Sequence, residues 1–239
     1  YANIVNNILS QDINLIGFVS NFFADDGILG LVKPFNKESA FHIFIKCMVY
    51  EFFVEDMNEY DEKVFDEYDS AGQIGKLYAE YVFEEYDVGY PFKDILEVNA
   101  SISYRDIEDY HESIVETGAL ETLCGKIADE VFYIMYNDRQ ALLNFNYLVT
   151  DYVRAVDKDS IEENEDVKRL FSKKGTLKRA EIPAWVKNAV YFRDRGRCCF
   201  CGCDLSGLLS PKSKKHYDHI VPLKTGGLND VSNIQLLCS

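Results

Sequence analysis

Long apolar runs are scarce in this sequence, and so is any segment that would direct the chain to a membrane. The longest apolar stretch, Phe41 to Val54, is interrupted by His42, Lys46 and Glu51, so no segment reaches the roughly 20 apolar residues that span a bilayer. The start, YANIVNNILS, has no basic region ahead of an apolar run and predicts no signal peptide. It also lacks an initial Met, from which we expect that further residues precede it. With 47% hydrophobic residues in 239, the chain can fill a core, and we expect a soluble globular protein.

Basic residues are scarce in the first two thirds of the chain. Residues 1–166 contain 35 acidic and 11 basic side chains, a net charge of −24. Residues 167–239 contain 5 acidic and 14 basic side chains, a net charge of +9, which brings the whole chain to −15. A basic part suits a polyanion and an acidic part is repelled by one. The two parts are therefore expected to face different partners.

Cysteine is absent from most of the chain and concentrated at its end. Of seven cysteines, Cys47 and Cys124 stand alone and are expected to be small buried side chains on helices, while five lie in the last 42 residues. An odd number with C-x-x-C spacing and no secretion signal indicates metal binding rather than disulfides. The expected compartment is reducing, most simply a cytoplasm.

Proline is also rare before residue 157, where only Pro34 and Pro91 occur. Apolar residues recur at helical spacing in segments such as SAFHIFIKCMVYEFF and ALLNFNYLVTDYVRAV, which predicts a mostly helical domain over residues 1–156. Ser39 is expected to cap a helix. The fold class is α+β, with this acidic helical domain followed by a small zinc module. His42 and His111 have no other candidate metal ligands nearby in the sequence and are interpreted as structural.

A change of composition marks the boundary between these parts. The run DKDSIEENED is acidic and almost free of apolar residues, and the segment after it is basic and contains Gly175 and Pro183, so residues 157–182 are interpreted as a charged linker. A helix is expected from near Pro183 to Gly196. Its apolar side, expected to pack on residues up to 239, is formed by Trp185, Val186, Ala189, Val190 and Phe192.

The segment RDRGRCCFCGCDL carries the spacing of a metal site. Cys198 and Cys201 form C-x-x-C followed by Gly202, a turn that lets two thiolates hold one tetrahedral zinc, and Cys238 could return to the same ion after a hairpin. A structural zinc needs a fourth ligand. The register is open, because Cys199 with Cys203, or Cys201 with Cys203, could also be ligands.

Two chemically distinct groups lie side by side in YDHIVP. Asp218 and His219 are expected on a short strand, where they project to opposite sides. A carboxylate suits a hard divalent ion, and a neutral imidazole suits general-base work. Asn233 follows the turn-rich KTGGLND and can fold back to face the first strand. There it would brace a loop or orient the imidazole.

The combination RDRGRCCFCG and YDHIVPLKTGGLNDVSNIQLLC resembles the HNH endonuclease family over about Arg193 to Ser239. The resemblance implies a ββα-metal finger that hydrolyses phosphodiester bonds in DNA. It implies that Asp218 holds a catalytic divalent ion, Mg²⁺ or Mn²⁺ in the first instance, that His219 is the general base, and that Asn233 is the middle residue of the triplet. Cys198, Cys201 and Cys238 would hold the structural zinc. The family's fourth cysteine, third catalytic residue and helix are expected just beyond Ser239.

Several basic side chains near these motifs are candidate phosphate contacts. They are Arg193, Arg195, Arg197, Lys214, Lys215 and Lys224. His216 is interpreted as an exposed strand residue. The resemblance makes a bacterial restriction or anti-phage setting plausible, with the acidic domain regulating the nuclease or docking a protein partner. The alternatives are a zinc-stabilised module that binds nucleic acid or protein without cutting, and a nuclease that acts on RNA.

Overall fold

The computed structural model describes residues 1–10, 27–71, 74–90, 92, 102–155, 161, 164–209 and 214–239, so Pro91 and parts of the expected linker lie outside it. The chain divides into two compact units. Unit 1 comprises Tyr1–Phe44 and Val131–Ser239, and unit 2 comprises Ile45–Glu130.

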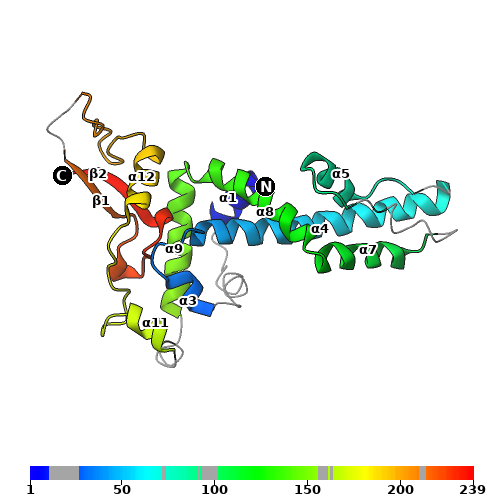
Figure 1. The fold of residues 1–239 in the computed structure, drawn as a ribbon, viewed down its shortest axis with the longest axis horizontal. Coiled ribbons are helices and arrows are strands. Elements are labelled where there is room, and N and C mark those ends of the chain that lie inside the picture. The colour runs from blue at the N-terminus through cyan, green and yellow to red at the C-terminus, as the bar shows by residue number, and fades with distance from the viewer. Residues whose placement is uncertain are drawn as a thin grey trace. The chain divides into compact units, whose positions relative to one another are not determined.

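The described residues are mainly helical with one small sheet, as the predicted α+β class requires (Figure 1). The helices are α1 (Ala2–Ser10), α3 (Gly27–Val32), α4 (Ala40–Ala71), α5 (Tyr78–Glu85), α7 (Tyr104–Glu116), α8 (Ala119–Met135), α9 (Arg139–Ala155), α11 (Glu165–Leu170) and α12 (Ala184–Arg193). The strands are β1 (Lys215–His219) and β2 (Ile234–Cys238), with the short 3-10 helices η1 (Leu223–Thr225) and η2 (Val231–Asn233) between them. Among the residues that the structure describes, no helix is long and apolar enough to cross a membrane.

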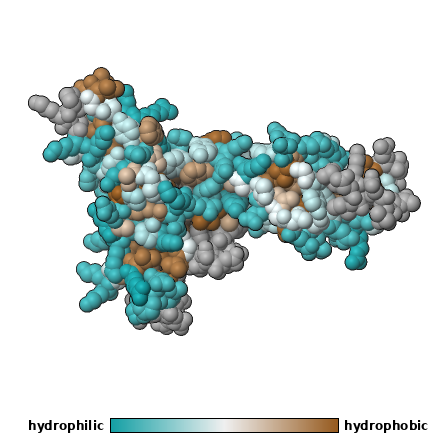
Figure 2. Space-filling model, in the orientation of Figure 1, coloured by the Kyte–Doolittle hydropathy of each residue, from teal (hydrophilic) through white to brown (hydrophobic). Residues whose placement is uncertain are grey.

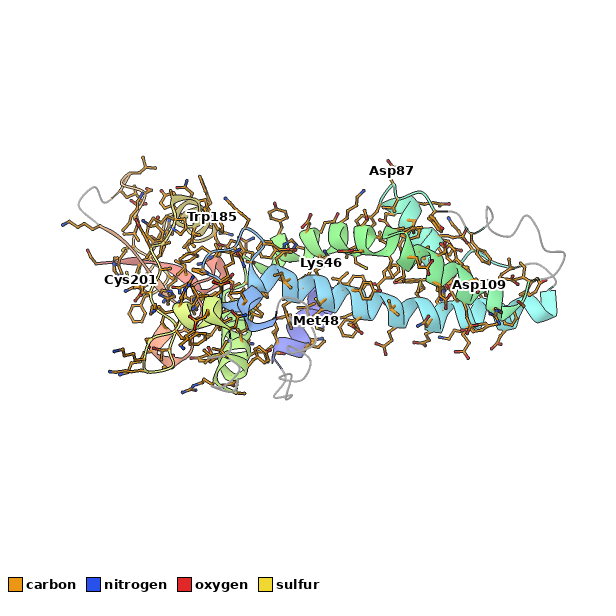
Figure 3. The ribbon with its side chains drawn as sticks, turned by 60° about the horizontal axis from the view of Figure 1, so that its bottom comes forward. Lys46, Met48, Asp87, Asp109, Trp185 and Cys201 are labelled. Carbon is orange, nitrogen blue, oxygen red and sulfur yellow. The ribbon has the colours of Figure 1, made fainter. Side chains whose placement is uncertain are left out.

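Unit 2 is built from amphipathic helices whose apolar positions recur every three or four residues. In α7 these positions are Ile107, Tyr110 and Ile114, all buried. His111 lies on the same helix, and its Nε2 is 2.8 Å from the Asp61 carboxylate, which also accepts a hydrogen bond from the Tyr78 N–H at 2.7 Å. This pair gives His111 the structural role expected of it. At the start of the unit the ammonium of Lys46, labelled in Figure 3, lies 3.1 Å from the Glu121 carboxylate.

The first helices of the chain share unit 1 with its C-terminal part. The Ser39 hydroxyl accepts the His42 N–H at 3.1 Å and caps α4, which confirms the predicted cap. The Phe41 and Phe145 rings lie 4.9 Å apart and join α4 to α9. From α9 the Asn146 amide donates to the Ser232 carbonyl at 3.3 Å. Residues from both ends of the chain therefore form one core, and the functional boundaries 1–156, 157–182 and 183–239 stay a prediction.

The described part of the expected linker is ordered. Residues 164–182 include α11, whose N-cap Asn164 accepts from the Asp166 and Val167 N–H groups, and a short antiparallel bridge between Phe171 and Leu177. Val167, Phe171 and Leu177 are 0%, 6% and 4% exposed. The three apolar anchors stand among many charged residues, and for this reason the sequence predicts a charged linker here.

The C-terminal module, residues 183–239, consists of α12 against a β-hairpin (Figure 1). Strands β1 and β2 pair antiparallel, with His219 opposite Ile234 and Lys215 opposite Cys238. One face of the hairpin joins Val186 and Val190 of α12 in a common core. Trp185, labelled in Figure 3, packs at its edge. The predicted apolar side of α12 is confirmed except at Phe192, which is 76% exposed because it projects away from the hairpin.

Candidate functional site

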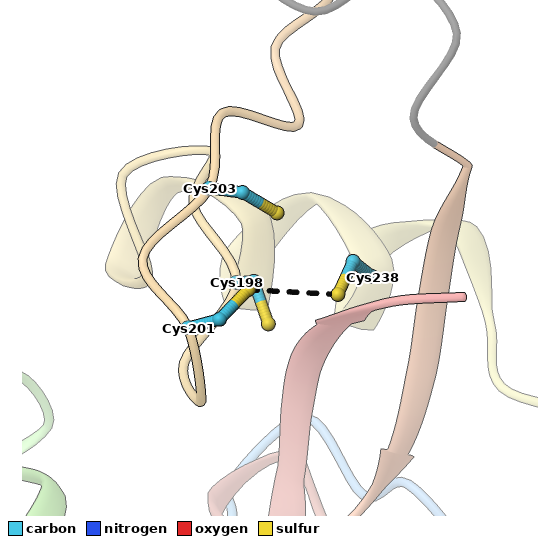
Figure 4. A group of neighbouring side chains, drawn as sticks. All are labelled: Cys198, Cys201, Cys203 and Cys238. Atoms are coloured by element: carbon cyan, nitrogen blue, oxygen red, sulfur yellow. Dashed lines mark hydrogen bonds between the residues drawn. The ribbon is translucent and has the colours of Figure 1, made fainter.

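Four cysteine sulfurs converge where the loop before β1 meets the end of β2. The Sγ atoms of Cys198, Cys201, Cys203 and Cys238 all lie within 4.8 Å of one another (Figure 4). Gly202 takes a φ of +70°, which turns the chain back after Cys201. The Cys199 N–H donates to the Leu236 carbonyl at 2.9 Å and ties this loop to β2. The fold therefore brings together residues that are 40 positions apart in the sequence numbering, from Cys198 to Cys238.

The donor set fits a structural zinc ion. Zn–S bonds of about 2.3 Å in a tetrahedron place sulfurs about 3.8 Å apart, and the Cys201 and Cys238 sulfurs are 3.6 Å apart. Backbone N–H groups, that of Cys201 foremost, lower the pKa of Cys198 to about 6. Hydrogen bonding to the Cys201 sulfur raises the pKa of Cys238 to about 12. A cation among the sulfurs would favour the thiolate in each of them.

The structure brings Cys203 to the cluster together with the three cysteines assigned from sequence. Cys199 has a different environment, where burial and the nearby Asp194 carboxylate raise the pKa of its thiol. Of the two open registers, pairing Cys201 with Cys203 agrees with this geometry, and pairing Cys199 with Cys203 does not. The C-x-x-C-x-C spacing was the only signal for Cys203, and the sequence left its choice open.

Asp218 and His219 project to opposite sides of β1, as predicted. His219 is 6% exposed and lies on the core side, whereas the Asp218 side chain is 45% exposed. The His219 Nδ1 and the Asp218 Oδ1 are 3.9 Å apart. Burial lowers the pKa of His219 below its ordinary value of 6.5. The imidazole is therefore neutral at pH 7 and able to accept a proton.

Asn229 determines which nitrogen of His219 is available. Its Nδ2 donates to the Lys178 carbonyl at 2.8 Å, and its Oδ1 accepts from the Ala180 N–H at 3.3 Å. These two partners assign the amide orientation, so the atom 3.3 Å from the His219 Nε2 is an oxygen, an acceptor. The proton of the neutral ring is on Nε2. The lone pair is on Nδ1, the nitrogen nearer to Asp218.

Asn233 braces the loop between the strands. Its Oδ1 accepts from the Val221 N–H at 2.8 Å, and its Nδ2 donates to the carbonyls of Val221 and Leu228 at 3.0 and 2.9 Å. Of the two roles considered from sequence, the structure shows loop bracing. Gly227 is required beside it, because a Cβ there would lie 2.0 Å from the Val221 oxygen. The loop holds Asn229 in reach of His219.

Asp218 is the one predicted ligand for a catalytic divalent ion, and its carboxylate forms an ion pair with Arg179. The Arg179 guanidinium donates to the Asp218 Oδ1 at 2.9 Å. Within the described residues, the four cysteines are the only group of three or more side chains able to hold a metal ion. The fit for a catalytic ion is therefore limited to one carboxylate with an imidazole beside it, and no ββα helix is seen among these residues.

The predicted phosphate contacts fall into two groups. Arg193 is 5% exposed, donates to Asp194 at 2.8 Å and 3.1 Å and to the Ile234 carbonyl at 2.6 Å, and so joins α12 to β2. The other five side chains are exposed: Arg195, Arg197, Lys214, Lys215 and Lys224. Figure 2 shows the surface of unit 1 as mainly hydrophilic with small hydrophobic patches. The geometry leaves these five open to a phosphate.

Comparison with known proteins identifies the class of this site. Residues 198–239 match the model of the HNH endonuclease family. This match covers the cysteine cluster and the Asp218–His219 hairpin, and it agrees with the resemblance that the sequence indicated. The match leaves residues 1–197 without an assignment. No curated protein and no solved structure matches the chain.

Two polar residues of the site escaped sequence reasoning. Asn229 stands in a turn-rich segment where an asparagine is ordinary, and Arg179 lies 39 positions before the carboxylate it contacts. Asp230, next to Asn229, is also buried and polar, and it is structural: it accepts from the Ala40 N–H at 3.0 Å and the Ser232 hydroxyl at 2.6 Å. Nothing in the local sequence distinguishes Asn229 from Asp230.

Proposed function

We propose that this protein is a metal-dependent endonuclease that hydrolyses phosphodiester bonds in DNA. The observation that carries the proposal is the His219 imidazole, neutral at pH 7 and hydrogen-bonded at Nε2 by Asn229, next to the Asp218 carboxylate within the part that matches HNH endonucleases. A neutral base with its proton held at Nε2 and its lone pair at Nδ1 has the chemistry that activation of water requires.

The chain's own residues would divide the reaction as follows. His219 takes a proton from a water molecule at Nδ1 while the water oxygen bonds to phosphorus, and the opposite P–O bond breaks. The leaving oxygen takes a proton from solvent. Asp218 would hold a divalent cation, Mg²⁺ or Mn²⁺, whose contribution is to neutralise charge on the phosphate. Arg195, Arg197, Lys214, Lys215 and Lys224 would contact phosphates, and Cys198, Cys201 and Cys238, with Cys203, would hold a structural zinc.

The acidic charge supports a separate role for unit 2. Residues 45–130 contain 23 acidic and 6 basic side chains, whereas the rest of the chain contains 17 acidic and 19 basic ones. Such a surface repels DNA and suits a protein partner or a regulatory contact. A restriction or anti-phage setting is compatible with this organisation, and its partner would be a protein with a basic surface.

The test is cleavage of supercoiled plasmid by the protein and by His219→Ala in the presence of Mg²⁺ or Mn²⁺. We expect metal-dependent nicking or linearisation by the first and a rate lower by about 100-fold or more in the second, the scale of losing a general base. Equal rates would show that His219 is not the base.

A second candidate function is a zinc-stabilised module that binds DNA without cutting. Two observations favour it, the 6% exposure of His219 and the engagement of Asp218 by Arg179. In this case the protein would retard DNA in a gel, and no plasmid would be cut with any divalent metal.

A further inference from the structure

A basic groove in unit 1 leads to the Asp218–His219 pair. Its walls are residues 179–182, Lys187 of α12 and the start of β1, and it is an open groove of about 660 Å³. Three cationic side chains line it, Arg179, Lys187 and Lys215, against one acidic side chain, Glu181. None of Arg179, Lys187 and Glu181 was singled out in the sequence.

The groove is continuous with the site through Arg179. This side chain lines the groove, and its guanidinium is 2.9 Å from the Asp218 carboxylate. It is also 59% exposed, so it can exchange this carboxylate for another anion at little cost. A phosphate bound to Arg179 would therefore lie beside Asp218 and within one residue of His219.

The other walls suit a chain of phosphates rather than a single small anion. The Lys215 ammonium lies 4.3 Å from the centre of the Tyr191 ring, which holds the charge at the groove wall. His216 and Tyr217 also line the groove, and flat side chains beside cations are common where a nucleic-acid strand binds. The groove is open to solvent, as a polymer requires.

We propose that this groove seats the phosphodiester backbone of the DNA strand and that Arg179 is the phosphate-positioning residue at its junction with Asp218. The proposal rests on the proposed function for the choice of DNA. It differs from that function in concerning binding, which a protein unable to cut would retain.

The experiment measures binding of a fluorescent DNA duplex to the whole protein in EDTA, over a series of salt concentrations. The test variant is Arg179→Gln/Lys187→Gln/Lys215→Gln. The matched control is Arg169→Gln/Lys173→Gln/Lys174→Gln, which removes the same charge outside the groove. Each phosphate contact contributes about 0.9 to the slope of log affinity against log salt, so the test variant should lose about 2 to 3 in slope, and the control should lose less than about 1. Equal slopes in the two variants would overturn the proposal.

Two further variants test the groove and the proposed chemistry separately. Glu181→Gln removes the one acidic wall residue and should tighten DNA binding; unchanged affinity would contradict the groove even if the triple variant failed to fold. His219→Ala should bind DNA like the unmodified protein. Groove-dependent binding by an unmodified protein that cuts no plasmid with any divalent metal would refute only the proposed chemistry. Tighter binding of a single-stranded RNA through the same three cations would overturn the choice of DNA.

Discussion

Replacing Asn229 tests whether the orientation of His219 is built into the loop. In Asn229→Ala the His219 Nε2, the Ala180 N–H and the Lys178 carbonyl lose partners at 3.3, 3.3 and 2.8 Å. A hydrogen bond contributes about 1 kcal/mol net, so the free energy of unfolding should fall by roughly 2 to 4 kcal/mol. Loss of a residue that orients a functional imidazole should lower the cleavage rate by about 10- to 100-fold.

Asn229→Asp separates orientation from mere stability. A carboxylate at this position still accepts from Nε2, and its charge should raise the pKa of His219 by about 1 to 3 pH units. The acid limb of the cleavage profile should move to higher pH by the same amount. Asn36→Ala is the matched control, because its amide also donates to a carbonyl in unit 1, that of Gly30 at 3.2 Å. It should lower stability without moving the pH profile.

The assay is NMR titration of the His219 ring, together with pH–rate profiles where the protein cuts DNA. The titration does not depend on activity, so it tests the geometry in either candidate function. A His219 pKa that is the same in Asn229→Asp and in the unmodified protein would show that the amide oxygen does not face Nε2. The assignment of Nδ1 as the base would then be wrong.

Other perturbations test the cluster, the loop and the buried imidazole. Cys201→Ser should lower the zinc content, measured by elemental analysis, from about one ion per chain. Cys199→Ser, which lies outside the cluster, should leave the zinc content unchanged. Equal zinc content in the two variants would contradict the four-sulfur site. Gly227→Ala should lower the free energy of unfolding, measured in urea, by about 1 to 3 kcal/mol, because its Cβ would lie 2.0 Å from the Val221 oxygen. Gly125→Ala is the control, because a Cβ there has nothing within 4 Å. It should be neutral or stabilising by up to about 1 kcal/mol. Since burial holds the pKa of His219 below 6.5, the unfolded state protonates first, so stability should fall as the pH is lowered through about 6.5. The pH dependence of unfolding should be shallower in His219→Ala, and an identical dependence would show that this histidine is not the group that titrates.

The sequence by itself determined the local elements and the chemistry they carry. Periodic apolar residues predicted the helices, Pro183 and Gly196 bracket α12, and alternation in YDHIVP placed Asp218 and His219 on opposite sides of a strand. The C-x-x-C spacing predicted Cys198 and Cys201 as metal ligands, with Cys238 expected to return to them after a hairpin, and it left the register open. The local elements could be predicted because helix period, strand alternation and C-x-x-C turns depend on residues a few positions apart.

Only the tertiary structure decided which distant side chains meet. The sequence predicted Arg193 as a DNA contact, but its side chain is buried against Asp194 and β2 and joins α12 to β2. Residues 164–182 read as a linker, yet three apolar side chains anchor the described part of this segment, and Arg179 thereby reaches Asp218. Asn229 contacts His219 because the loop braced by Asn233 returns to β1. Such contacts depend on packing between segments far apart in the chain, and the local sequence does not predict that packing.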